Sequence, residues 1–197
     1  MKNFKQYIES KKADADKLDL KTAKVIAKEI IKKLNLKYID TIKGNDFYKL
    51  NAGIPVGSIR REKALVGDID ILITKPISSA IIANIEGVTE IQSKGDKQIF
   101  FEYISDAGVV ASLNLWILPK NQADSFGAMM LHTTGSHQYN ILLRMIAKRA
   151  GEKLNQYGVF DSDNKQIAGM SEDEVYKALK TKKWPDGKEW KHPKDRK

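Results

Sequence analysis

The feature that most constrains the fold is the run of residues 68–74, with the sequence DIDILIT. Isoleucines alternate along it with Asp68, Asp70 and Leu72, which is the period of a β-strand. On a strand, Asp68 and Asp70 point to the same face, with Cα atoms about 6.6 Å apart. Two carboxylates on one face can bind a hard cation such as Mg²⁺, which completes its shell with phosphate oxygens and water.

An Asp-x-Asp pair alone is more often part of a solvent-facing edge strand than a metal site. The residues upstream change that balance, because Gly57 and Ser58 precede the pair and Arg61 follows them closely. A glycine lets the backbone approach a phosphate, and hydroxyl, guanidinium and backbone N–H groups are good triphosphate donors. Together they predict chemistry on a nucleoside triphosphate. The competing interpretation is an ordinary turn followed by surface arginines.

The remaining patterns predict an α+β chain. Helical spacing indicates a helix over residues 20–34 with Asp19 as its cap, and a turn signal favours a hairpin within residues 36–56. Further along, we expect a helix over 77–85, strands over 97–103 and 109–118, a turn at 133–136, a helix from Tyr139 to Gly151, and a capping-box helix after Ser171. This order indicates a sheet with helices, then a smaller mixed lobe, with a boundary near Asn121.

Composition bounds the function. The 197 residues carry a formal net charge of +9 and no cysteine, which excludes disulfides, thiolate zinc sites and cysteine nucleophiles. A basic surface favours polyanions such as nucleic acid, although a solvated lysine-rich surface accounts for the charge about equally well. The sequence has no run of about 18 apolar residues and no apolar signal segment, so we expect an intracellular, cytoplasmic protein without a membrane partner.

The motifs also carry a family resemblance. Gly57-Ser58, a spacer, and Gly67-Asp68-x-Asp70 form the nucleotidyltransferase pattern, and the flanks within 57–63 and 68–74 are similar to the palm signature of family X DNA polymerases. Further landmarks of that family are residues 118–120, 125–128, 134–136, Asn140, 155–158 and 190–196. The chain resembles the smallest viral members. The resemblance implies a palm domain at 1–121 and a thumb domain at 122–197, with neither a fingers nor a lyase domain.

The resemblance also assigns roles to individual residues. It implies a DNA-directed polymerase that extends a primer 3′-hydroxyl at gaps or ends, in DNA repair, as a monomer using dNTPs and two Mg²⁺ ions, with Mn²⁺ as a substitute. The metal ligands and catalytic residues would be Asp68, Asp70 and the residue at position 114. The nucleotide-binding residues would be Gly57, Ser58, Arg61, Gly67, His132, Gly135 and Asn140. Arg144 and Lys148 would contact DNA, unless this stripe is a plain solvated helix face.

Two positions depart from the family pattern. Asn114 stands where the family has a third aspartate. Asparagine can ligate a metal through its carbonyl oxygen but carries no charge and is a very poor base, so we predict retained nucleotide binding, a weakened second metal and severely reduced chemistry. The asparagine is either natural or a deliberate exchange. His132-Thr133 replaces a Tyr-Phe pair, which predicts incomplete exclusion of ribonucleotides.

Two alternative functions remain open at this stage. The first is a template-independent nucleotidyltransferase acting on RNA ends or on protein. The second is a nucleic-acid end-binding module whose catalysis has been lost at Asn114.

Overall fold

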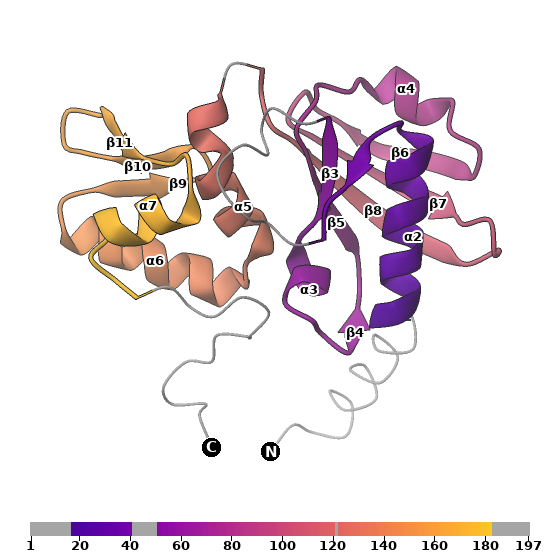
Figure 1. Ribbon diagram of the computed structural model, residues 1–197, viewed down its shortest axis with the longest axis horizontal. Helices are drawn as coiled ribbons and strands as arrows, with labels where there is room; N and C mark the ends of the chain where they lie inside the picture. The colour runs from indigo at the N-terminus through magenta and orange to yellow at the C-terminus, as the bar shows by residue number, and fades with distance from the viewer. Residues whose placement is uncertain (1–16, 41–50, 121, 183–197) are drawn as a thin grey trace.

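The computed structural model describes residues 17–40, 51–120 and 122–182, and its centre is a mixed six-stranded sheet (Figure 1). In spatial order the strands are β2 (Lys37–Tyr38), β3 (Ala52–Pro55), β5 (Ile69–Ile73), β8 (Val110–Ile117), β7 (Gln98–Ile104) and β6 (Val88–Lys94). The central strands β5 and β8 run parallel, whereas β7 pairs antiparallel with both β8 and β6. The α+β prediction is therefore confirmed.

Helix α2 (Leu20–Lys33) covers one face of the sheet. It begins where predicted, because the Asp19 side chain accepts a hydrogen bond from the backbone N–H of Thr22. Its apolar stripe, which includes Ile26 and Ile30, packs in the main core against the isoleucines of β5 and the inward residues of β7 and β8. Within the described residues, no helix is both long and apolar enough to cross a bilayer.

Three local predictions need correction. The hairpin within residues 36–56 is wrong, because β2 and β3 pair in parallel and a hairpin requires antiparallel strands. Its expected turn, residues 43–46, lies outside the described residues. The helix expected over 77–85 is only α4 (Ser79–Ala83), and strand β6 was not predicted. Alternation along β6 is weak because both of its faces are polar or half-buried.

The C-terminal lobe, residues 123–182, combines three helices with a small antiparallel sheet. Its elements are η2 (Ala123–Ser125), α5 (Phe126–Thr134), α6 (His137–Arg149), β9 (Lys153–Asn155), β10 (Gly158–Phe160), β11 (Gln166–Ala168) and α7 (Glu172–Ala178). Helix α5 was not predicted, and it includes Thr133 and Thr134 of the turn expected at 133–136, so that only Gly135 and Ser136 lie between α5 and α6. The expected cap of α7 is present, since the Ser171 hydroxyl accepts from the backbone N–H of Glu174.

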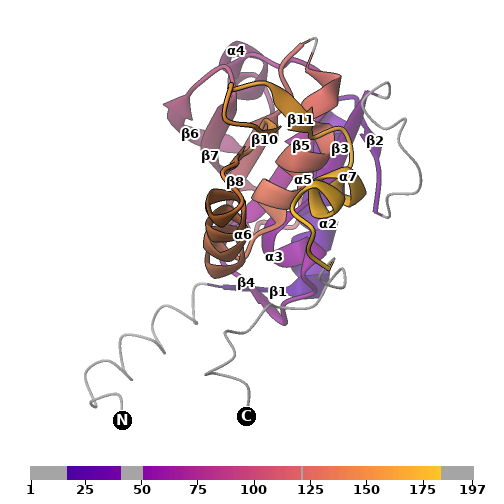
Figure 2. The same ribbon diagram turned by 90° about the vertical axis from the view of Figure 1, so that its left-hand side faces the viewer.

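Helix α5 lies between the sheet and the rest of this lobe, and Figure 2 looks onto the lobe with the sheet behind it. Phe126, Met129 and Met130 of α5 join an apolar cluster with β3 residues and Leu72 of β5. The face of the sheet opposite α2 is therefore partly covered by α5. Residue 121, where we placed the domain boundary, lies outside the described residues, so the division stays a prediction.

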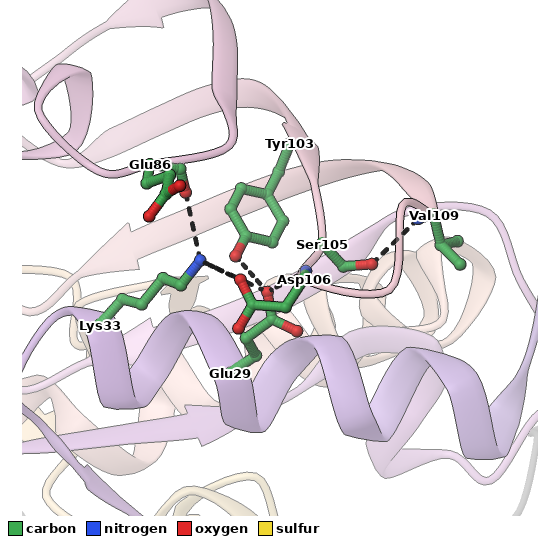
Figure 3. A network of polar contacts seen from close by, with 7 residues as sticks. All are labelled: Glu29, Lys33, Glu86, Tyr103, Ser105, Asp106 and Val109. Carbon is green, nitrogen blue, oxygen red and sulfur yellow. Dashed lines mark hydrogen bonds and ion pairs between the residues drawn. The ribbon is translucent and has the colours of Figure 1, made fainter.

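On the α2 face, a set of polar residues fixes the turn between β7 and β8 (Figure 3). Lys33 Nζ lies 2.6 Å from Asp106 Oδ1 and 3.6 Å from Glu29 Oε1. Glu29 also accepts hydrogen bonds from the Tyr103 hydroxyl and from the backbone N–H of Asp106. We call Glu29, Lys33, Tyr103 and Asp106 the Lys33 cluster.

Candidate active site

Asp70 is the centre of the site, on the face of β5 away from α2. The backbone N–H of Val56 donates to the carbonyl of Asp70 (2.9 Å), which holds the start of α3 (Gly57–Arg60) against β5. Gly57 has a φ of +55°, and a Cβ there would lie 2.1 Å from Asp70 Oδ2. Only glycine fits this position without displacing the carboxylate. The structure thus brings the glycine-serine loop and the aspartate together.

The neighbouring strand supplies two hydrogen-bond donors to the same carboxylate oxygen. Strands β5 and β8 place Asn114 directly beside Asp70. Asn114 Nδ2 donates to Asp70 Oδ1 over 3.0 Å, and Trp116 Nε1 donates to it over 3.1 Å. The Asn114 carbonyl oxygen accepts instead from Gln98 Nε2, at 2.8 Å, across the β7–β8 pair. Asn114 is only 8% exposed, so these contacts with neighbouring side chains orient its amide.

Negative charge accumulates at this site. Burial, and then the charge of Asp68, raise the pKa of Asp70 from 3.8 to about 6, while Trp116, Asn114 and the charge of Arg61 oppose the shift. Asp68 itself immediately precedes β5 and is exposed. A partly buried carboxylate beside a second carboxylate is the arrangement that a divalent cation stabilises most.

The two consecutive arginines both contact Thr134 but differ in their other partners. Arg61 Nη2 donates to the Ser58 hydroxyl over 3.2 Å, and Arg61 Nη1 donates to the backbone carbonyl of Thr134. Arg60 donates to the Thr134 hydroxyl over 2.6 Å and forms a bidentate pair with Glu172 at 2.8 and 2.7 Å. Of the two, Arg61 therefore lies where it can meet a phosphate at Gly57 and Ser58.

His132, at the end of α5, connects the carboxylates to α6. Its ring meets Trp116 edge-on, with centroids 5.8 Å apart, and its Nδ1 lies 3.2 Å from Arg144 Nη2. Because a guanidinium can only donate, Nδ1 is the acceptor here. Burial, and then the Arg144 charge, lower the pKa of His132, so the ring is neutral at pH 7. Asn140 Nδ2 donates to the His132 carbonyl over 2.8 Å.

The other predicted residues lie at different distances from this centre. Gly135 separates α5 from α6 with a φ of +69°, and a Cβ there would lie 3.2 Å from Arg61 Nη1. Gly67 has open space around it, since a Cβ there would meet only the Lys17 side chain, at 4.0 Å. Lys148 is exposed one turn beyond Arg144. Sequence reasoning missed the roles of Gln98 and Trp116, because only the strand pairing brings Trp116 to Asp70 and Gln98 to Asn114.

The residues present suit one divalent cation better than two. Asp68 and Asp70 offer carboxylate oxygens beside donors suited to phosphate, and this donor set fits a cation that carries a nucleotide. Within the described ranges, no group of three or more histidine, aspartate or glutamate side chains could hold a metal ion. A second ion would need Asn114, whose oxygen accepts from Gln98.

Comparisons with known proteins agree with this geometry. The DNA polymerase beta thumb family matches residues 129–197. Repair DNA polymerase X of African swine fever virus is 32% identical over 114 residues, which are 54% of this chain and 63% of the viral protein. The DNA polymerase/3′-5′ exonuclease PolX of Bacillus subtilis is 28% identical over 128 residues, which are 61% of this chain and 21% of that protein. The chain thus spans less than two thirds of these relatives.

Solved structures extend the likeness to the fold of both lobes. Polymerase beta of Leishmania infantum, in a ternary P/T complex, superposes with a TM-score of 0.67 over 90% of this chain and 78% of that one, at 14% identity. Its ternary gap complex gives a TM-score of 0.66 at 15% identity, over 90% of this chain and 72% of that one. At such identities the likeness establishes the fold alone. Together with the matches in sequence, it shows that the chain resembles the family X DNA polymerases, and residues 129–197 match the polymerase beta thumb.

Proposed function

We propose that this chain is built for nucleotidyl transfer to the 3′-hydroxyl of a DNA primer at gaps or ends, in DNA repair. The observation that carries the proposal is the contact of Gly57 with Asp70. It sets a phosphate-binding loop beside a pair of carboxylates. The viral relative is a repair DNA polymerase by name, and the bacterial one is a DNA polymerase by name, which supports the same class of substrate. We assign residues 1–121 to the catalytic palm and 122–197 to the thumb.

We assign a separate role to each residue of the site. Ser58 and Arg61 bind the triphosphate tail, and Gly57 leaves room for it beside Asp70. Asp68 and Asp70 hold Mg²⁺, or Mn²⁺ in its place, which neutralises charge on the phosphates when bound. His132, Gly135 and Asn140 form the side of the pocket that receives the sugar and base of the dNTP. Gly67, which immediately precedes Asp68, is assigned to the same triphosphate pocket.

Asn114 reduces the chemistry of this chain. A carboxylate at that position could help hold a second cation beside the primer hydroxyl and accept its proton, whereas an amide carries no charge and is a very poor base. The hydrogen bonds of Asn114 to Asp70 and Gln98 favour a second candidate function, a nucleic-acid end-binding module that retains nucleotide without transferring it. A template-independent transferase is the third candidate.

The thumb is assigned to duplex binding. Arg144 and Lys148 are exposed on one side of α6, whose buried side carries Tyr139 and Leu143. Basic side chains along a helix bind phosphates through counterion release, so binding of a monomer to gapped DNA should weaken steeply with salt. Replacing Lys148 with alanine should lower the slope of log K against log salt by about 1. Fluorescence anisotropy at several salt concentrations measures this slope.

The decisive experiment is primer extension on a gapped duplex. We expect Asn114→Asp to raise the rate by about 10²- to 10⁴-fold, the range typical of a restored general base. The control is Asp68→Asn in the same background, which should abolish the gain. Incorporation that ignores the template base would favour the template-independent transferase. An Asn114→Asp protein that binds gapped DNA but remains as slow as the parent would favour the end-binding module.

His132 leads to a separate expectation about the sugar. A neutral imidazole in place of a tyrosine offers a ring nitrogen rather than a bulky aromatic edge, so we expect ribonucleotides to be excluded incompletely. Single-turnover incorporation of dNTP and rNTP by the Asn114→Asp protein measures the ratio. A strong preference for dNTP, retained in His132→Ala, would contradict this role.

A further inference from the structure

We infer that Gln98 is a positioning residue that holds Asn114 as a hydrogen-bond donor to Asp70, so that the site takes one divalent cation with its nucleotide instead of two. The inference rests on the proposed function, because it concerns the same carboxylates. It adds a residue that no motif indicates, and it specifies how many cations the site takes.

The orientation of the Asn114 amide follows from its two neighbours. An ionised carboxylate can only accept hydrogen bonds, so Asp70 Oδ1 requires the NH₂ group of Asn114 to face it. The carbonyl oxygen of Asn114 must then point the other way, toward β7. There it meets Gln98 Nε2 at 2.8 Å, which is a donor. Both ends of the amide are thus satisfied, and turning it over would set oxygen against oxygen at Asp70.

The sheet keeps Gln98 in place. Antiparallel pairing sets Gln98 opposite Trp116 and Phe100 opposite Asn114, so Gln98 reaches Asn114 diagonally across two strands. Trp116 in turn donates to the same Asp70 oxygen as Asn114. Gln98, Asn114 and Trp116 therefore form one neutral network around the carboxylate. In this network the Asn114 oxygen faces Gln98 rather than the space in front of the two aspartates.

This network has a consequence for metal binding. A single cation can still be shared by Asp68, Asp70 and a triphosphate. A second cation would have to break the bond between Gln98 and Asn114, turn the amide and lose its bond to Asp70. A neighbouring residue that orients a ligand changes metal affinity by about 10- to 100-fold. Gln98→Met should remove the constraint while keeping the length of the side chain.

The orientation can be tested in the free protein by NMR. Through-hydrogen-bond couplings are expected from Gln98 Nε2 to Asn114 Cγ and from Asn114 Nδ2 to Asp70 Cγ at pH 8. Gln98→Met should abolish the first coupling and leave the backbone spectrum otherwise unchanged. A matched control is Gln92→Met, whose amide donates to Glu102 at 3.3 Å, away from Asp70. If Asn114 Nδ2 showed no coupling to Asp70, the inference would be overturned.

The number of ions can be counted by Mn²⁺ electron paramagnetic resonance with a non-hydrolysable α,β-imido dNTP. We expect one protein-dependent Mn²⁺ in the parent and in Gln92→Met, and two in Asn114→Asp. In Gln98→Met the second ion should bind about tenfold tighter than in the parent. Two equally tight ions in the parent, or an unchanged second ion in Gln98→Met, would overturn the inference. The proposed function fails separately, if the couplings are present but Asn114→Asp binds no Mn²⁺–nucleotide complex.

Discussion

The six-stranded sheet carries a polar cluster on each face, and the two clusters treat their carboxylates in opposite ways. On the α2 face, the Lys33 cluster sets one lysine against Glu29 and Asp106. On the other face, Asp68 and Asp70 lie together, and the pKa of Asp70 rises to about 6. The first cluster sets a lysine against both of its carboxylates within the protein, which leaves a net charge of −1. The second keeps negative charge that an external cation can neutralise.

The difference shows how stability and function are separated in this fold. Unfavourable charge at a site persists only where the surrounding structure compensates for it. The Lys33 cluster fixes the turn between β7 and β8, and these strands carry Gln98 and Asn114. A well-paired cluster on one face thus supports the strands that hold a strained pair of carboxylates on the other.

The largest expected effect is on the free energy of unfolding when Arg60 is replaced. It tests whether a charged side chain stabilises the protein because it is paired, or whether its nearness to the site matters more. Arg60 lies next to Arg61, yet its side chain and that of Glu172 are each only 13% exposed and fully paired. Arg60→Met should destabilise the protein by about 3–5 kcal/mol, because it removes the bidentate guanidinium from a carboxylate that is only 13% exposed. Urea unfolding measures the loss. The double variant Arg60→Met/Glu172→Met should recover most of it, and a single variant as stable as the parent would contradict the role of pairing.

Asp70→Asn, unlike Arg60→Met, should raise the free energy of unfolding. The pKa of Asp70 is about 6 in the folded protein against an ordinary value of 3.8, so the folded state holds this proton more tightly. As pH rises from 3.8 to about 6, the contribution of Asp70 to the free energy of unfolding therefore falls, by at most about 3 kcal/mol. Above this range the contribution stays low. Without metal, Asp70→Asn should be more stable than the parent at pH 8 and nearly equal at pH 4. Unfolding in EDTA at both pH values checks this, and a less stable variant at pH 8 would break the comparison.

Glu29→Gln makes the same acid-to-amide change in the Lys33 cluster. It removes the charge that faces Lys33 and weakens the bond from the buried Tyr103 hydroxyl, so we expect a loss of about 1–2 kcal/mol at pH 8. Measured beside Asp70→Asn, it forms a matched pair with opposite expected signs. Equal signs in the two variants would show that the clusters do not differ as we describe.

The smallest expected effect is that of Trp116→Phe, which tests how the Trp116 hydrogen bond contributes to the pKa of Asp70. Trp116→Phe keeps an aromatic ring beside His132 but removes one donor to Asp70 Oδ1. Losing a bond that favours the ionised form should raise the pKa of Asp70 further, with a cost of about 1 kcal/mol. Carboxyl ¹³C shifts followed through a pH titration report this pKa. An unchanged pKa would mean that the Trp116 hydrogen bond does not favour the ionised form of Asp70.

Much of the fold follows from local patterns. The period-2 run at 68–74 predicted β5, Asp19 and Ser171 predicted the starts of α2 and α7, and alternation in β8 predicted that Asn114 and Trp116 share a face. Each of these depends on neighbours within a few residues, so the sequence alone is sufficient. The glycine-serine loop and the Asp-x-Asp pair were likewise recognisable, because the chemistry of their side chains is specific.

Contacts between distant segments were decided only by the tertiary structure. The pattern of a strand tells which residues share a face but not which strand lies beside it, so the parallel pairing of β2 with β3 was missed. The same limit hid Gln98, which meets Asn114 only through the register of β7 on β8. It also hid the divergence of Arg60 and Arg61. Adjacent in sequence, they differ in their contacts because the packing of α7 gives one of them a carboxylate and leaves the other beside Ser58.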